Sequence, residues 1–175
     1  PQKCSRGPQV IAIGGDTETG VTDSVEALDM MGDQDMMGEI SSTMNLPRRR
    51  WRHSAFVLPG SQDILVCGGK GRYDGTDTLR ACIVHTNKTW TDHSSLLHPR
   101  IYSSTVTMPS GDLFLIGGSY SPETSEVLYN GASTWTEGPA LTAPLDRACA
   151  VNLGDDKLVL VGGGVKHDMV SVYNL

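Results

Sequence analysis

The residues of this chain that could do chemistry are densest in the segment LPRRRWRH, Leu46–His53. Its four arginines can each hold a carboxylate through two parallel hydrogen bonds. Trp51 among them offers a large apolar anchor of the kind enriched in protein interfaces. The segment therefore predicts a pocket for an acidic stretch of a protein partner. The plainer interpretation, a solvated loop whose arginines form only weak surface ion pairs, stays open.

Other reactive clusters lack the spacing that metal or phosphate chemistry requires. His93 and His98 are five residues apart, and nothing beside them completes a tetrahedral ligand set. The acidic run Asp16–Glu26 does not follow the alternate-position pattern of a calcium loop. The glycine-rich stretches Gly68–Gly75 and Gly162–Asp168 precede no expected helix and do not match a phosphate loop. We expect no metal site, no cofactor and no enzyme activity.

Two further features bear on modification. The four cysteines are widely spaced, and we interpret them as small buried strand residues with free thiols. Cys67 and Cys82 fall on strands that should be neighbours, so a bridge between them stays open. Asn87–Thr89 fits the acceptor pattern for N-glycosylation, but Asn is also an ordinary turn residue, and we favour the turn.

Composition excludes several classes of function. The chain has a net charge of −6, and one short basic loop lacks the broad positive footprint of a nucleic-acid-binding protein. No apolar run approaches the roughly 20 residues of a membrane-spanning helix, so no membrane partner is expected. No signal peptide is recognisable at the start, although a chain that begins at Pro1 leaves the compartment open. We favour the cytoplasm over secretion.

A repeated pattern indicates how these residues are positioned. An apolar run followed by two glycines occurs four times, with spacings of 54, 49 and 45 residues. The pairs are Gly14 and Gly15, Gly68 and Gly69, Gly117 and Gly118, and Gly162 and Gly163. Trp90 and Trp135 follow their glycine pairs by 21 and 17 residues. This periodicity predicts a repeated structural unit.

Each unit divides into four short strands separated by Gly, Pro, Asn and Asp. The first strand follows an arginine, at Arg52, Arg100 and Arg147, and the second ends at the glycine pair. No helical period is present, which predicts an all-β fold of antiparallel strands. The glycines should permit a close approach between neighbouring units where the second strand ends.

An apolar run with Gly-Gly, then an aromatic residue such as Tyr129, then Trp135, resembles the kelch repeat. The resemblance implies blades of a β-propeller, four-stranded sheets arranged around a channel. Met36 and Met37 stand where the first unit should have Trp. We expect a single segment over 1–175 with fourteen strands: a partial blade 8–45, complete blades 50–96 and 99–141, and a partial blade 146–175.

Two complete and two partial blades do not make the usual kelch propeller, so the chain is expected to be a fragment of a longer protein. An open arc would leave apolar faces and strand edges in water. We therefore expect that it needs additional blades or associates with itself.

The resemblance implies an interaction module or adaptor, because kelch propellers recruit substrates for cullin-type ubiquitin ligases or bind actin. Recognition is expected on the loops before the first strands and after the second strands, where nine of the fourteen basic residues fall. The predicted partner-binding residues are Arg48, Arg49, Arg50, Trp51, Arg52, His53, Arg72, Tyr73, Arg100, Tyr102 and Arg147.

Two alternatives stay open. One is a secreted or surface kelch protein, for which a Cys67–Cys82 bridge and the Asn87 acceptor would be the marks. The other is a fragment of a copper-radical oxidase of the galactose oxidase type, which the segment Arg100–Tyr120 resembles. There Tyr102 would bind copper and be cross-linked to a cysteine one blade earlier. That position falls near residues 51–54, which contain no Cys.

Overall fold

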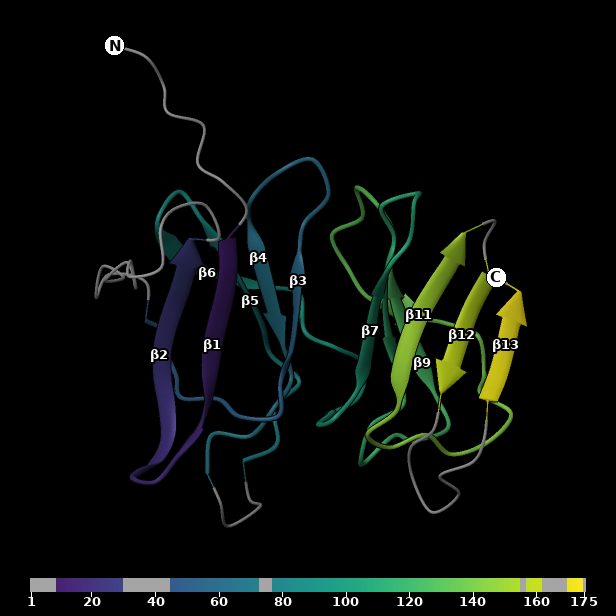
Figure 1. Cartoon of the computed structure of the whole chain (residues 1–175), viewed down its shortest axis with the longest axis horizontal. Coiled ribbons are helices and arrows are strands. Elements are labelled where there is room, and N and C mark those ends of the chain that lie inside the picture. Colours follow the sequence, from purple (N-terminus) through teal and green to yellow (C-terminus); the bar gives the residue numbers. More distant parts are fainter. Residues whose placement is uncertain (1–8, 30–44, 73–76, 155–156, 162–169, 175) are drawn as a thin grey trace.

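The computed structural model describes residues 9–29, 45–72, 77–154, 157–161 and 170–174 (Figure 1). These ranges contain thirteen strands and no helix. The described strands form four separate antiparallel sheets of two to four strands rather than one closed barrel. The expectation of an all-β, antiparallel fold is therefore confirmed.

The sheets follow one another along the chain, and each is a simple meander. The first sheet has β1 (Gln9–Thr17) and β2 (Gly20–Asp29). The second has β3 (Ser54–Val57), β4 (Ile64–Cys67), β5 (Cys82–Thr86) and β6 (Thr89–His93). The third has β7 (Ser104–Thr107), β8 (Leu113–Ile116), β9 (Ser125–Leu128) and β10 (Thr136–Glu137). The fourth has β11 (Cys149–Gly154), β12 (Lys157–Val161) and β13 (Val170–Asn174).

These sheets fall inside the four units expected from the sequence. The units 50–96 and 99–141 contain the two four-stranded sheets, and 8–45 and 146–175 contain the smaller ones. The strand expected around Met36 lies outside the described residues.

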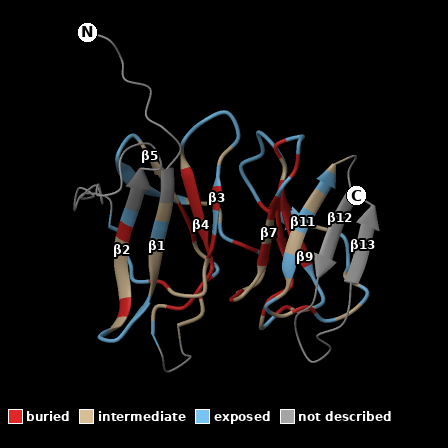
Figure 2. Ribbon diagram, viewed as in Figure 1, coloured by how far each residue is buried: buried red, intermediate tan, exposed pale blue. Residues whose placement is uncertain are grey.

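The core lies between the sheets, because the second strands of the second and third sheets bury both of their faces. The strands β4 (ILVC; Figure 2) and β8 (LFLI) are therefore continuously apolar and buried at every residue. In β4, Val66 packs toward the first sheet, and Leu65 packs toward the third. Two tryptophans also lie in the cores between adjacent sheets. Trp90 packs between the first and second sheets, and Trp135 is buried between the second and third.

The first strands of successive sheets lie side by side, with β7 between β3 and β11. Backbone hydrogen bonds from the glycine pairs also join neighbouring sheets. The second glycine of each described pair donates its N–H to a carbonyl in the loop that enters the next sheet: Gly15 to Arg50, Gly69 to Arg100 and Gly118 to Leu145. The pair Gly162 and Gly163 lies outside the described residues.

The first glycine of a pair has no room for a side chain. Gly68 has φ +70°, and a Cβ there would lie 2.7 Å from the carbonyl oxygen of Arg100. At Gly117, with φ +61°, a Cβ would overlap the carbonyl oxygen of Leu145. Gly14 has φ +54° and meets Arg50 in the same way. Only glycine combines this backbone conformation with so close an approach.

The strand register corrects the alignment of the arginines. Ser54, Ser104 and Cys149 are equivalent, since each pairs with the residue that ends the second strand of its sheet. Counting back from them, Arg50, Arg100 and Leu145 share one position, and Arg52, Tyr102 and Arg147 share another. The predicted equivalence of Arg52, Arg100 and Arg147 is therefore wrong for Arg100. The loop has two arginine-bearing positions two residues apart, and residue type alone does not distinguish them.

The cysteines also differ from the expectation of free buried thiols. Cys67 and Cys82 form a disulfide, because the register of β4 and β5 places them directly opposite each other. Cys149 is free but exposed on β11. Cys4 lies outside the described residues.

Candidate binding surface

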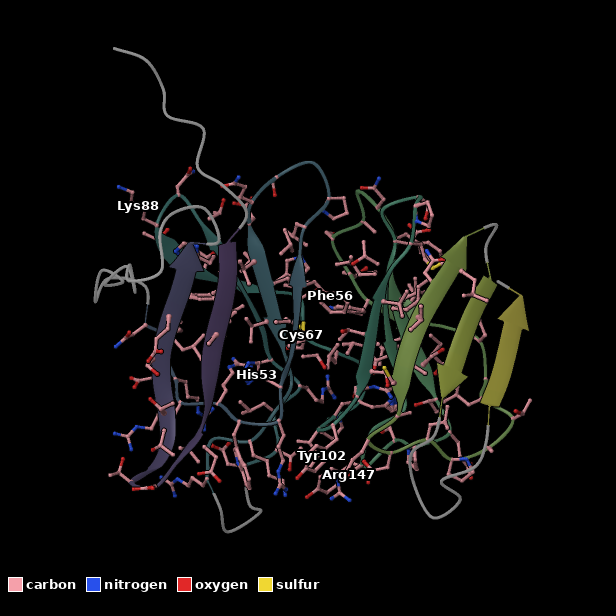
Figure 3. All side chains as sticks on the ribbon, viewed as in Figure 1. His53, Phe56, Cys67, Lys88, Tyr102 and Arg147 are labelled. Atoms are coloured by element: carbon pink, nitrogen blue, oxygen red, sulfur yellow. A yellow bond between two sulfur atoms is a disulfide. The ribbon has the colours of Figure 1, made fainter. Side chains whose placement is uncertain are left out.

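The loops that enter β3, β7 and β11 bring four predicted partner-binding residues together at one end of the molecule. Tyr102 and Arg147 lie side by side there, at the lower end of Figure 3, and Lys88 lies at the opposite end. The guanidinium of Arg52 is 3.6 Å from the centroid of the Trp51 ring and 4.4 Å from that of Tyr102. Arg147 lies 4.3 Å from the Tyr102 ring. We call Trp51, Arg52, Tyr102 and Arg147 the arginine–aromatic stack.

The backbone holds this stack in an unusual conformation. Arg52, Tyr102 and Arg147 each have φ 57°, in the left-handed region. The N–H of Tyr102 donates to the carbonyl of Arg52, and the N–H of Arg147 donates to that of Tyr102, at 3.2 Å each. A left-handed conformation costs a residue with a Cβ about 1–2 kcal/mol. Glycine would avoid that cost, so these three large side chains are present despite the strain.

The positive charges of the stack have few carboxylate partners. Of the three ion pairs in the described residues, none includes Arg52. Arg147 is 63% exposed, and its nearest carboxylate, Asp146, is 3.8 Å away. The stack therefore presents two guanidinium groups with little local neutralisation. Tyr102, the residue that the oxidase alternative assigns to copper, has these two cations at its ring, an environment that favours an anion over a metal ion.

Further cationic groups lie on the same loops. Arg48 forms an exposed ion pair with Asp77 at 2.6 Å, and Arg49 and Arg72 are exposed. Tyr73 lies outside the described residues.

Lys70, one of the nine basic residues expected on these loops, and Tyr120 were not among the predicted partner-binding residues. The Nζ of Lys70 lies 5.2 Å from the centroid of the exposed Tyr120 ring. A hydrogen bond from the Lys70 side chain lowers the pKa of the Tyr120 phenol. Their place in the sequence could have identified them, because both lie just after a glycine pair: Lys70 follows Gly69 directly, and Tyr120 follows Gly118 by two residues.

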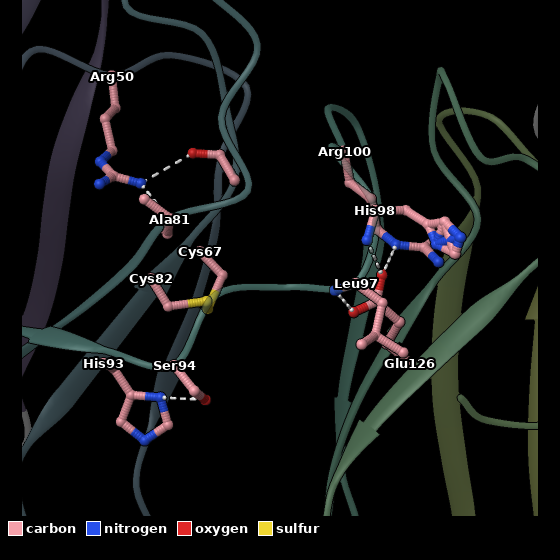
Figure 4. The surroundings of a disulfide bond; sticks show 11 residues. Arg50, Cys67, Ala81, Cys82, His93, Ser94, Leu97, His98, Arg100 and Glu126 are labelled. Atoms are coloured by element: carbon pink, nitrogen blue, oxygen red, sulfur yellow. Dashed lines mark hydrogen bonds and ion pairs between the residues drawn. A yellow bond between two sulfur atoms is a disulfide. The ribbon is translucent and has the colours of Figure 1, made fainter. Parts of the chain in front are cut away.

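Arg100 was predicted to bind a partner, and this is wrong because it is buried. Its Nε donates to Oε1 of Glu126 at 2.8 Å, and both side chains are 1% exposed (Figure 4). Its Nη1 donates to the carbonyls of Gly117, Ser121 and Thr124, and its Nη2 to Oγ1 of Thr124. Glu126 also accepts the N–H groups of Leu97 and His98. Arg100 therefore holds the third sheet and its entry loop together.

Arg50 is the equivalent residue of the second sheet, and its predicted role in partner binding is wrong for the same reason. Its Nη1 donates to the carbonyls of Gly68 at 3.0 Å and Ala81 at 2.8 Å (Figure 4). Burial, and then the charge of Arg48, lowers its pKa to about 10, so it stays charged at neutral pH.

His53, also a predicted partner-binding residue, is half-buried, and its surroundings disfavour a charged imidazole. Its ring packs against the backbone of Gly14, and its Cβ lies against Gly69. Burial, and then the charge of Arg50, lowers the pKa of the imidazole to about 4. At neutral pH His53 is an uncharged packing residue between the first and second sheets.

Metal-binding clusters and membrane-spanning helices are both absent from the described part of the chain. In that part, no group of three or more His, Cys, Asp and Glu side chains is placed to hold a metal ion. Nor does a helix there have the length and apolar character to cross a membrane. Neither protein-family models nor curated proteins give a match to the chain.

Proposed function

We propose that the chain is a segment of a kelch-type β-propeller and acts as a protein-interaction module. Three features support the fold: the meander of each sheet, the side-by-side first strands β3, β7 and β11, and glycine pairs in matching positions. The packing of each sheet between two neighbours is the arrangement that stacked repeats use to build a continuous core.

The arginine–aromatic stack is the observation that supports recognition of an acidic segment. Its residues come from the entry loops of three successive sheets, so the surface forms only when the sheets pack together. Arginine guanidinium groups with exposed hydrogen-bond donors suit carboxylates, and the aromatic rings supply rigid contact area.

An exposed apolar face supports the need for further sheets or self-association. Val151 on β11 is 48% exposed, whereas Phe56 and Val106, at the equivalent positions of β3 and β7, are 4% and 6% exposed. Leu153 on β11 is 64% exposed. A further sheet packed on β11 would bury these side chains as the third sheet buries Phe56. The variant V151S/L153S should therefore reduce self-association in sedimentation velocity, and an unchanged distribution of species would argue against this part of the proposal.

The acidic-segment proposal is tested with a labelled, capped hexaglutamate peptide, and a hexalysine peptide serves as the reverse-charge probe. Binding is measured by fluorescence anisotropy at low and high salt. The double variant R52S/R147S should weaken hexaglutamate binding about tenfold or more, because charged hydrogen bonds contribute about 1.5–3 kcal/mol each. The matched control K88S removes a cation from the exposed β5–β6 turn at the opposite end and should change binding less than twofold.

Any of three outcomes would refute the assigned surface. One is equal binding of hexaglutamate by the wild type and R52S/R147S. Another is a wild type that binds hexalysine as tightly as hexaglutamate, and the third is a wild type that binds neither peptide. R48S/R49S tests the two exposed arginines of the segment without disturbing Arg50, which donates to the carbonyls of Gly68 and Ala81.

A specific observation favours the secreted or surface form of this module as a second candidate. Cys67 and Cys82 are bridged and almost fully buried. Disulfides persist in oxidising compartments and are rare in the cytosol. The test is to isolate the protein without a reducing agent, denature it and count its free thiols. Bridged Cys67 and Cys82 support secretion, and four free thiols support the cytoplasm.

A further inference from the structure

The β5–β6 hairpin turn has a geometry that accounts for the residue types at its exposed tip. Thr86 pairs with Thr89, so Asn87 and Lys88 form a two-residue turn, with φ 49° and 66°. Two positive φ values define a type I′ turn, which favours Asn at its first position. The turn therefore explains Asn87, and the hydroxyl of Thr89 closes the turn by donating to the carbonyl of Thr86 at 3.0 Å, a bond that Ser could also make.

Asn87–Thr89 is the only Asn-X-Ser/Thr triplet with X other than Pro in the 175 residues. Asn87, Lys88 and Thr89 are all exposed. In the described part of the chain, no hydrogen bond engages the carboxamide of Asn87. The amide nitrogen is therefore free to carry a substituent that extends into solvent.

The disulfide in the same sheet supplies an independent indication of compartment. The bridge joins β4 to β5, and β5 leads directly into this turn. An oxidising environment that maintains a bridge is also the environment in which secreted chains meet the glycosylation machinery. The bridge and the triplet thus point to the same route through the cell by unrelated chemistry.

The position of the turn suits a bulky group. Lys88 marks the end of the molecule opposite Tyr102 and Arg147, so a glycan there would leave the arginine–aromatic stack open (Figure 3). It would also stand beside β6, the edge strand of the second sheet, whose outer backbone groups have no strand partner within that sheet. Edge strands are prone to pair with other chains, and a bulky polar group at one end obstructs such pairing.

We propose that Asn87 is an N-glycosylation site. The Nδ2 of Asn87 forms a bond to the anomeric C1 of an oligosaccharide donated by a polyprenyl diphosphate carrier. The bond between C1 and the diphosphate oxygen breaks, the polyprenyl diphosphate leaves, and the amide loses one proton. This inference rests on the secreted form of the module and is independent of acidic-segment binding.

The test directs the full chain into the secretory pathway of cultured animal cells with a cleavable leader. Wild-type protein from the medium should decrease in mass on treatment with peptide-N-glycosidase F, and peptide mapping should find Asp at position 87 after release. N87Q and T89A should lose this shift, whereas T89S, which preserves the acceptor hydroxyl, and K88S, which preserves the triplet, should retain it.

Secretion of bridged wild-type protein without a modification at Asn87 would overturn the proposal. So would retention of the chain in the cells with Asn87 unmodified. Hexaglutamate binding by N87Q separates this failure from a failure of the proposed function, because the variant should bind the peptide as the wild type does.

Discussion

Replacement of Arg100 by Met tests whether the buried arginine holds the third sheet together. The variant R100M removes the ion pair with Glu126 and four further hydrogen bonds to Gly117, Ser121 and Thr124. The Glu126 carboxylate would remain buried, with only the N–H groups of two neighbouring residues as donors. Loss of one partner from a buried pair costs about 3–5 kcal/mol. For a chain of this size, about 2–4 °C per kcal/mol places the fall in Tm at roughly 6–20 °C.

Guanidinium chloride unfolding, followed by tryptophan fluorescence, measures this free energy. The control R147S removes an exposed arginine from the equivalent loop of the next sheet and should change stability by no more than about 0.5 kcal/mol. R100K keeps the positive charge but loses the planar fork, so it should fall between the wild type and R100M.

The double variant R100M/E126L locates the cost. If R100M/E126L recovers much of the stability that R100M loses, the loss comes from the unpaired Glu126 carboxylate. If the double variant is as unstable as R100M, the loss comes from the backbone carbonyls that Arg100 no longer binds. A loss for R100M no greater than that for R147S would refute the structural role and return Arg100 to the set of surface arginines.

Three other perturbations test single features of the fold. His53 has a pKa of about 4 in the folded chain and an ordinary value of 6.5 unfolded, so its contribution is complete above pH 6.5 and is lost as the pH falls toward 4. The wild type should lose up to about 3 kcal/mol relative to H53N over that range, and parallel pH profiles in chemical unfolding would contradict it. G117A should cost roughly 2 kcal/mol more than G131A, measured by the same unfolding, because both glycines have positive φ but only Gly117 lacks space for a Cβ. C67A/C82A should lose about 3 kcal/mol, given the 15-residue separation, and calorimetry should find the reduced wild type equally destabilised; unchanged Tm values would show that the bridge does not form.

The sequence carried enough local information to predict the strands. In β4 and β8, four consecutive apolar residues end at a glycine pair, and this pattern specifies a strand buried on both faces. The glycine pairs also marked the place of close approach, because only a residue without a Cβ fits there. Turn residues such as Asn87 marked where one strand ends and the next begins, since positive φ values restrict the choice of residue.

The roles of the arginines could not be read in the same way. Arg50 and Arg52 are two residues apart in the same loop, yet one is buried under backbone carbonyls and the other stacks on half-buried rings. A guanidinium suits both environments equally well, so the residue type does not indicate whether an arginine side chain points into the core or toward the surface. The bridge between Cys67 and Cys82 depended likewise on the register of β4 and β5, which residue types alone left open.

The sequence by itself determined where the strands run, where the chain turns and which four segments repeat, because these depend on side-chain size, polarity and backbone freedom over a few residues. Only the tertiary structure decided which arginines are buried, that His53 is neutral and that Tyr102 lies between two cations. Those outcomes depend on which sheet packs against which, and on the burial and hydrogen-bond partners that this packing creates between residues far apart in the chain.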